Sequence, residues 1–218
     1  MFIRNEDDKN KFYQKGARLW GRLLVSASLM KVEVSGLENI PDDTNVIFTP
    51  NHQSYLDIFI LLKYLPRPFR FIIMRSLFKV PVIGHHIAQA GFLSLDRKDR
   101  KRSVKTIHLI IDMLGKNESF VIFPEGKLTG DGSIGEFGRG TSIIIQRSRK
   151  PVVPIAIDGT FGVLPKGAWR LRPAKVRVRI GKPVHFEKHY DEISKRTSLD
   201  LGNELKKIVM GLNVRGRA

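Results

Sequence analysis

The chain has no cysteine among its 218 residues. That absence excludes disulfide cross-links, thiolate metal sites and a cysteine nucleophile, and it removes the usual indicator of redox compartment. No run of 18 uncharged apolar residues occurs, so a membrane-spanning helix is not expected. The first residues, Met1 to Lys9, lack the apolar core of a signal peptide. We therefore expect a chain that stays in the cytoplasm.

Acidic side chains are scarce relative to basic ones. The chain has 38 Lys and Arg against 21 Asp and Glu, a formal net charge of +17 and a pI near 10.3. Such a charge attracts polyanions, whether nucleic acid, anionic lipid headgroups, or a phosphorylated or acidic substrate. Charge alone does not choose among them.

The region from Lys11 to Met30 has the pattern of a two-faced helix. One face carries a basic stripe and the other an apolar one: Lys11, Lys15, Arg18 and Arg22 against Phe12, Leu19, Trp20, Leu23, Leu24 and Ala27. A basic amphipathic helix with a Trp is typical of an interfacial membrane anchor. The same pattern is also common in ordinary helices docked on a core. We interpret residues 1–30 as a membrane-interface helical segment preceding one main domain, residues 31–218.

Beyond this segment, apolar strand-like runs alternate with helical ones. Strands are expected at 31–36, 45–48, 69–74, 92–95, 119–123, 151–157 and 175–180, and helices at 58–62, 98–114, 141–146 and from residue 201 onward. The stretch 81–84 is expected to break the chain. This alternation favours a layered α/β domain.

The stretch Thr-Pro-Asn-His-Gln-Ser-Tyr-Leu-Asp, residues 49–57, joins a buried strand to a helix. His52 is placed in the turn, Ser54 as a helix cap and Asp57 in the first helical turns. A carboxylate at Asp57 can fold back onto one imidazole nitrogen and leave the other free as a base. A histidine near a helix start is also often only structural, so this pattern needs support from elsewhere.

That support comes from three further stretches at predicted strand ends, where α/β folds place their sites. They are Gly-Phe-Leu-Ser-Leu-Asp-Arg at 91–97, Phe-Pro-Glu-Gly at 123–126 and Val-Val-Pro-Ile at 152–155. In this order the four stretches resemble the glycerolipid acyltransferase superfamily, and within it the 1-acylglycerol-3-phosphate (lysophosphatidate) acyltransferase branch, the PlsC-like proteins. The resemblance covers about residues 31–185.

The resemblance implies a single α/β domain with a curved, mostly parallel or mixed sheet flanked by helices, preceded by an amphipathic helix. It also implies that His52 is the general base for an acceptor hydroxyl and that Asp57 orients the imidazole. Glu125 would hold acceptor hydroxyls, and the N–H of Gly126 would face the developing oxyanion.

Two arginines are assigned to the acceptor phosphate by the same resemblance. Arg97 would grip it, and Arg75 stands where family members carry a second phosphate-binding lysine. The chain departs from the family after Phe-Pro-Glu-Gly, where many members have Thr-Arg-Ser and this chain has Lys127, Leu128 and Thr129. That departure puts the acceptor headgroup in question more than the reaction.

The implied reaction moves a fatty acyl chain from acyl-carrier protein or acyl-CoA to a lysophospholipid, 1-acylglycerol-3-phosphate giving phosphatidic acid. No bound cofactor or metal is implied, the donor being a co-substrate. The implied partner is an anionic membrane surface, contacted peripherally on its cytoplasmic side. An alternative is the same mechanism on another lyso-lipid headgroup.

Two other classes of protein share some of these features. A basic nucleic-acid- or membrane-binding module without catalysis would explain the charge, but the basic runs contain few of the interleaved aromatics that nucleic-acid binding uses. No nucleic-acid partner is therefore expected. A metal-dependent hydrolase would have to use His52, Asp57 and Glu125, a poor ligand set.

Overall fold

A seven-stranded, mostly parallel sheet forms the centre of the molecule. The computed structural model describes residues 6–96 and 99–212. The strand order is β1-β7-β6-β2-β5-β3-β4, and among these pairs only β6 and β7 run antiparallel. The expected α/β fold with a mixed, mostly parallel sheet is confirmed.

The expected strands and helices appear in the expected order, with two further short helices between them. The strands are β1 (Lys31–Ser35), β2 (Ile47–Pro50), β3 (Arg70–Met74), β4 (Leu93–Leu95), β5 (Phe120–Val121), β6 (Val152–Asp158) and β7 (Lys175–Ile180). The α-helices are α1 (Glu6–Ala27), α2 (Leu56–Tyr64), α3 (Ile83–Gln89), α4 (Arg100–Gly115), α5 (Arg139–Ser148), α6 (Thr160–Val163) and α7 (Lys195–Leu212). Within the described ranges, short 3-10 turns lie at η1 (Leu37–Asn39), η2 (Arg75–Lys79) and η3 (Glu187–His189).

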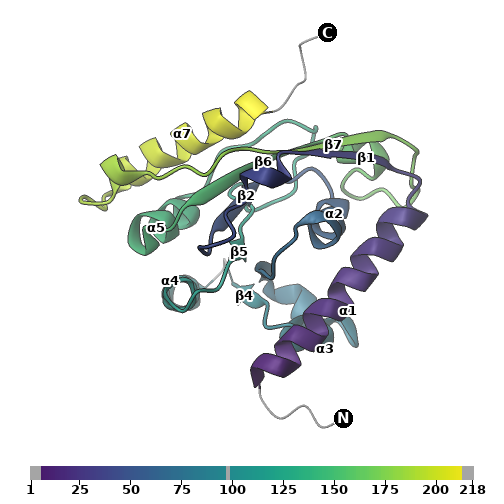
Figure 1. Ribbon diagram of the computed structural model, residues 1–218, viewed down its shortest axis with the longest axis horizontal. Coiled ribbons are helices and arrows are strands. Elements are labelled where there is room, and N and C mark those ends of the chain that lie inside the picture. The colour runs from purple at the N-terminus through teal and green to yellow at the C-terminus, as the bar shows by residue number, and fades with distance from the viewer. Residues whose placement is uncertain (1–5, 97–98, 213–218) are drawn as a thin grey trace.

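Helices cover both faces of the sheet and give it two apolar cores (Figure 1). Alternate residues of each central strand point to opposite faces, so Phe48 of β2 joins the core under α1 and α2, while Ile47 joins the core under α4, α5 and α7. The central strands are apolar on both sides for this reason, as buried parallel strands usually are.

Helix α1 packs on α2 and leaves an apolar stripe exposed. Gly21 and Val25 are buried, and Gly21 lies so close to α2 that an added Cβ would sit 2.8 Å from the Leu62 Cβ. The opposite face carries large apolar side chains that are 56–61% exposed: Phe12, Leu19, Trp20 and Leu23. The helix is therefore docked on the core and apolar toward the outside at the same time.

The basic stripe expected on α1 is only partly solvent-exposed. Lys15 and Arg22 are exposed, but Arg18 is half-buried and donates to the Pro66 and Arg67 carbonyls, with its guanidinium over the Phe69 ring. None of the helices in the described ranges is both long enough and apolar enough to span a bilayer.

Two local expectations differ from the structure. The break expected at 81–84 is a turn only at Pro81 and Val82, where Val82 has a positive φ of 65°, and a short helix, α3, begins already at Ile83. Helix α2 begins at Leu56 with Tyr55 in the capping position, although the Ser54 hydroxyl does accept from the Leu56 N–H at 3.3 Å. The same Ser54 hydroxyl also donates at 2.7 Å to the carbonyl of Leu164, so it bonds outside the helix as well.

The close approach of α1 to α2 predicts opposite effects for two glycines of the same helix. Gly21→Ala should destabilise the protein by about 1–3 kcal/mol, because the new methyl group collides with Leu62 and with the Phe59 carbonyl. Gly16→Ala meets nothing within 4 Å and should stabilise it by up to about 1 kcal/mol through helix propensity. Urea unfolding of both variants measures the difference, and equal effects would contradict this packing of α1.

Candidate active site

The turn that carries His52, residues 51–55, lies next to the Phe-Pro-Glu-Gly turn, residues 123–126. The two are neighbours because they follow neighbouring parallel strands. β2 pairs with β5 through Ile47–Phe120 and Phe48–Val121, so both turns leave the same edge of the sheet. On the other side of β2, the Asn51 side chain bonds to the N–H and carbonyl of Ile157 at 2.7 and 2.9 Å. This pair joins the end of β2 to β6 and sets where the turn begins.

His52 and Asp57 face each other as the sequence predicts. The imidazole Nδ1 lies 2.9 Å from the Asp57 Oδ2, and the His52 side chain is 12% exposed whereas the Asp57 side chain is fully buried. Because the carboxylate is an acceptor, Nδ1 carries the hydrogen and Nε2 is left with its lone pair. Such an imidazole can take a proton from a substrate hydroxyl.

Three other donors hold the Asp57 carboxylate in place. Its Oδ2 accepts from the backbone N–H of Gln53 at 2.7 Å and of Ser54 at 2.9 Å. Its Oδ1 accepts from the Thr160 hydroxyl at 2.6 Å. Hydrogen bonds from backbone and side chain thus compensate for the burial of a charged group.

Thr160 is a site residue that the sequence reasoning missed. It is fully buried at the start of α6, after Gly159 has turned the chain with φ of 97° at the end of β6. The signal was present, because Asp158, Gly159 and Thr160 are polar or turn-forming residues directly after an apolar strand. Recognising their role required knowing that β6 lies next to β2.

Glu125 is tied to the backbone on both sides of the site. Its Oε1 accepts from the His52 N–H and its Oε2 from the Gly135 N–H, each at 2.8 Å. Burial raises the pKa of Glu125 above its usual range, against the opposing effect of these two hydrogen bonds. Each oxygen keeps a further lone pair, so the carboxylate can still accept from a substrate hydroxyl.

Gly126 has a structural role in the turn. Its φ of 67° lies in the left-handed region that favours glycine, and its N–H donates to the Phe123 carbonyl at 3.0 Å. In the structure the Gly126 N–H is thus bonded to the Phe123 carbonyl. To contact an oxyanion, as the sequence predicts, this N–H would have to break or share that hydrogen bond. The Phe123 ring stacks on the His52 imidazole with centroids 3.8 Å apart.

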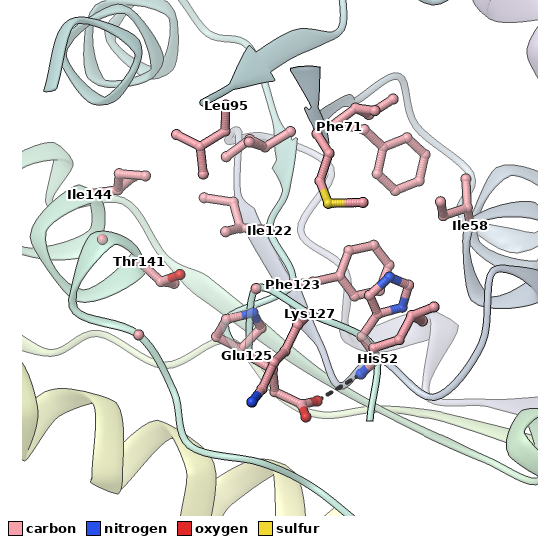
Figure 2. A pocket seen from close by; sticks show the side chains of 18 of the residues that line it. His52, Ile58, Phe71, Leu95, Ile122, Phe123, Glu125, Lys127, Thr141 and Ile144 are labelled. Carbon is pink, nitrogen blue, oxygen red and sulfur yellow. Dashed lines mark hydrogen bonds between the residues drawn. The ribbon is translucent and has the colours of Figure 1, made fainter. Parts of the chain in front are cut away.

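A cavity of about 460 Å³ opens beside His52. Figure 2 shows the polar side chains of His52, Glu125 and Lys127 gathered at one end, and apolar ones at the other. The apolar part is lined from both faces of the sheet, by side chains including Ile58, Phe71, Ile73, Leu95, Ile107, Ile110, Ile122 and Ile144.

The cavity lies in a split in the sheet. β3 pairs with β5 only through Arg70 and Phe71, and its remaining residues pair with β4 alone. Because β5 ends at Val121, the sheet opens between the two strands beyond that level. The cavity lies there, with Ile73 on one side and Ile122 on the other.

Of the two predicted phosphate-binding arginines, the structure describes Arg75, which lies at the end of β3. Arg97 lies outside the described residues. Arg75 follows β3 directly, and its Nη1 lies 3.0 Å from the Asp96 Oδ2. Both side chains are partly exposed, and the neighbouring residues Met74 and Leu95 line the cavity. The guanidinium has further donors to offer a ligand.

The described residues offer no metal ligand set. In the ranges that the structure covers, no three His, Asp or Glu side chains are grouped so that they could hold a metal ion. His185 and His189 are four residues apart, but the His189 Nε2 lies 3.0 Å from the Glu204 Oε2.

Comparison with known proteins places this geometry in context. The model of the acyltransferase family matches residues 31–158. A chloroplastic 1-acyl-sn-glycerol-3-phosphate acyltransferase of Arabidopsis thaliana is 35% identical over 182 residues, which cover 83% of this chain and 51% of that protein. The enzyme of that name from Pseudomonas aeruginosa is 34% identical over 160 residues, covering 72% of this chain and 61% of that protein.

A solved structure is similar over almost the whole chain. The 1-acyl-sn-glycerophosphate acyltransferase PlsC of Thermotoga maritima has a TM-score of 0.79 and 28% identity, and the match covers 99% of this chain and 86% of that one. The chain spans about half the length of the curated plant relatives it matches.

The raised pKa of Glu125 predicts a pH dependence of stability. A carboxyl whose pKa is higher in the folded than in the unfolded chain stabilises the fold at low pH, and this contribution is lost as the pH rises from the usual glutamate range through the raised value. The free energy of unfolding of the wild type, minus that of Glu125→Gln, should therefore fall over this interval. Urea unfolding of both proteins from pH 4 to pH 7 tests this, and a difference that is constant or rises with pH would contradict it.

Proposed function

Since the chain belongs to the acyltransferase family, we propose that it moves a fatty acyl chain from an acyl thioester to the free hydroxyl of a lysophospholipid. The observation that carries the proposal is the 2.9 Å His52–Asp57 pair at the polar end of an apolar cavity. By similarity to the relatives named 1-acyl-sn-glycerol-3-phosphate acyltransferase, the acceptor is 1-acylglycerol-3-phosphate and the product phosphatidic acid.

The reaction follows from the free Nε2 of His52. This nitrogen takes the proton of the acceptor hydroxyl while the oxygen attacks the thioester carbonyl carbon. The imidazolium that forms is stabilised by the buried Asp57 carboxylate. The tetrahedral intermediate collapses with cleavage of the C–S bond, and His52 returns the proton to the thiolate. A thioester carbonyl is already activated, so no covalent acyl-enzyme is needed, in keeping with a chain that has no cysteine.

The cavity can hold both the apolar and the polar parts of the substrates. Its apolar part suits a hydrocarbon chain, since burial from water drives such a ligand into a preformed apolar pocket. At the polar end we assign Glu125 to the acceptor hydroxyls. Arg75 and Arg97 are assigned to the acceptor phosphate, with Arg75 exchanging part of its contact with Asp96 for the ligand.

We further propose that the protein works at the cytoplasmic face of an anionic membrane and is held there by residues 1–30. The support is the exposed apolar stripe of α1, which lies opposite the face docked on α2, together with the exposed Lys15 and Arg22. An apolar stripe flanked by cations is the pattern of a helix that lies in the bilayer interface.

The acyl-transfer mechanism predicts a large loss of rate when the base is removed. His52→Ala should lower kcat by about 10²- to 10⁴-fold, because nothing then takes the acceptor proton. Asp57→Asn should also lower it strongly, because an amide can offer hydrogen to Nδ1 and favour the wrong tautomer. The assay is transfer from acyl-carrier protein and from acyl-CoA to a panel of lyso-lipids that differ in headgroup.

Circular dichroism and unfolding curves establish that the variants are folded before rates are compared. Wild-type rates in a folded His52→Ala protein would overturn the mechanism. If the enzyme prefers an acceptor whose headgroup lacks a phosphate, the mechanism still holds but the proposed acceptor is wrong.

Thr160 is predicted to be a positioning residue for Asp57. Thr160→Val keeps the shape but loses the hydroxyl that bonds to Oδ1 at 2.6 Å, so kcat should fall by roughly ten- to a hundredfold if the loss of about 1.5–3 kcal/mol is felt in the transition state. Thr160→Ser keeps the hydroxyl and should restore most of the rate. A purely structural role would lower stability in Thr160→Val and leave kcat per folded molecule unchanged.

A further inference from the structure

The loop between α6 and β7, residues 164–174, carries a second set of exposed apolar and basic side chains. Trp169 is 80% exposed and Leu171 46% exposed. The loop has three basic residues, Lys166, Arg170 and Arg172, and no acidic one. The Arg170 guanidinium carbon lies 4.4 Å from the Trp169 ring centre. A tryptophan exposed to this degree contributes little to the core.

The loop is fastened at both ends to parts already described. The Leu164 carbonyl accepts from the Ser54 hydroxyl at 2.7 Å, which connects the loop to the turn that carries His52. The Ala174 carbonyl accepts from the Lys31 N–H at 3.2 Å, which connects it to the start of β1, just after α1. Within the loop, Lys166 lines the cavity beside His52.

The loop also lies on the same side of the sheet as α1. Leu164 and Ala174 pack against the apolar core that α1 and α2 cover, whereas α7 belongs to the core on the other face (Figure 1). Leu29, in the turn between α1 and β1, is 69% exposed. This turn therefore adds an exposed apolar side chain between α1 and Lys31, whose N–H bonds to the end of the loop.

We propose that loop 164–174 is a second membrane-insertion point, in which Trp169 and Leu171 enter an anionic lipid surface and the loop cations contact its headgroups. Indole rings favour the boundary between water and hydrocarbon, and cations beside them are attracted by anionic lipid. The inference rests on the proposed action at a lipid surface. With α1 it gives two contacts with the membrane, and the cavity that Lys166 lines opens next to one of them.

The chain offers a direct readout because its two tryptophans are Trp20 in α1 and Trp169 in the loop. Trp20→Phe leaves Trp169 as the only indole, and Trp169→Phe leaves Trp20. Each full-length variant is mixed with saturating vesicles of phosphatidylglycerol and phosphatidylcholine, with and without brominated acyl chains. For the Trp20→Phe protein we expect emission at shorter wavelength, quenching by bromine and reduced quenching by acrylamide.

The outcomes separate the loop from the α1 anchor. The loop proposal is overturned if the Trp20→Phe protein binds vesicles while the emission of Trp169 and its quenching by acrylamide stay at their values in solution. A Trp20 response in Trp169→Phe would then still support the α1 contact. A response of Trp169 alone would support the loop and reject α1. A Trp169 response to duplex DNA without one to vesicles would reject lipid as the partner.

A matched pair of charge variants tests the basic residues. The double variant Arg170→Gln, Arg172→Gln should bind anionic vesicles with an affinity roughly tenfold or more lower, as measured by co-sedimentation. Lys195→Gln with Arg196→Gln removes the same charge from the exposed start of α7 on the other face and should change binding much less. Equal losses in the two pairs would show a response to net charge alone and would overturn a local contact by the loop.

Discussion

The buried carboxylate of Asp57 organises the turn that carries His52, because four donors converge on it, three from the turn and one from the end of β6. The His52 ring and two backbone N–H groups come from the turn itself, and the Thr160 hydroxyl comes from the end of β6. A charge with no solvent exposure is tolerated only when its lone pairs are occupied. The same requirement that keeps Asp57 in the core therefore fixes the direction of the imidazole.

The position of β2 between β6 and β5 brings the other parts of the site to His52. Both neighbours run parallel to β2, so their carboxyl ends deliver Thr160 from one side and Glu125 from the other. The Glu125 carboxylate then holds the His52 N–H, and the Phe123 ring supports the imidazole by stacking. Preorganisation of this kind reduces the rearrangement needed during a reaction.

Most strands and the His52, Asp57 and Glu125 cluster could be predicted from the sequence, because polar residues at the ends of apolar runs mark them locally. Thr160 could not, since its role depends on the long-range pairing of β6 with β2. Helix α3 is only seven residues long and directly follows the turn at Pro81 and Val82, which hides it in the sequence. Arg18 turns inward because the Pro66 and Arg67 carbonyls accept its hydrogens. The partner of the Gly126 N–H likewise depends on turn geometry that composition does not reveal.

The early end of β5 has a consequence for how a long ligand would move. Because β3 and β5 separate beyond Val121, the cavity is lined by side chains of both cores, with Phe71 and Ile73 from one and Ile110 and Ile144 from the other. A long apolar ligand bound there would pack against both cores at once. Its exit would break contacts with both, and each further methylene of the ligand would add apolar surface that has to be exposed to water again.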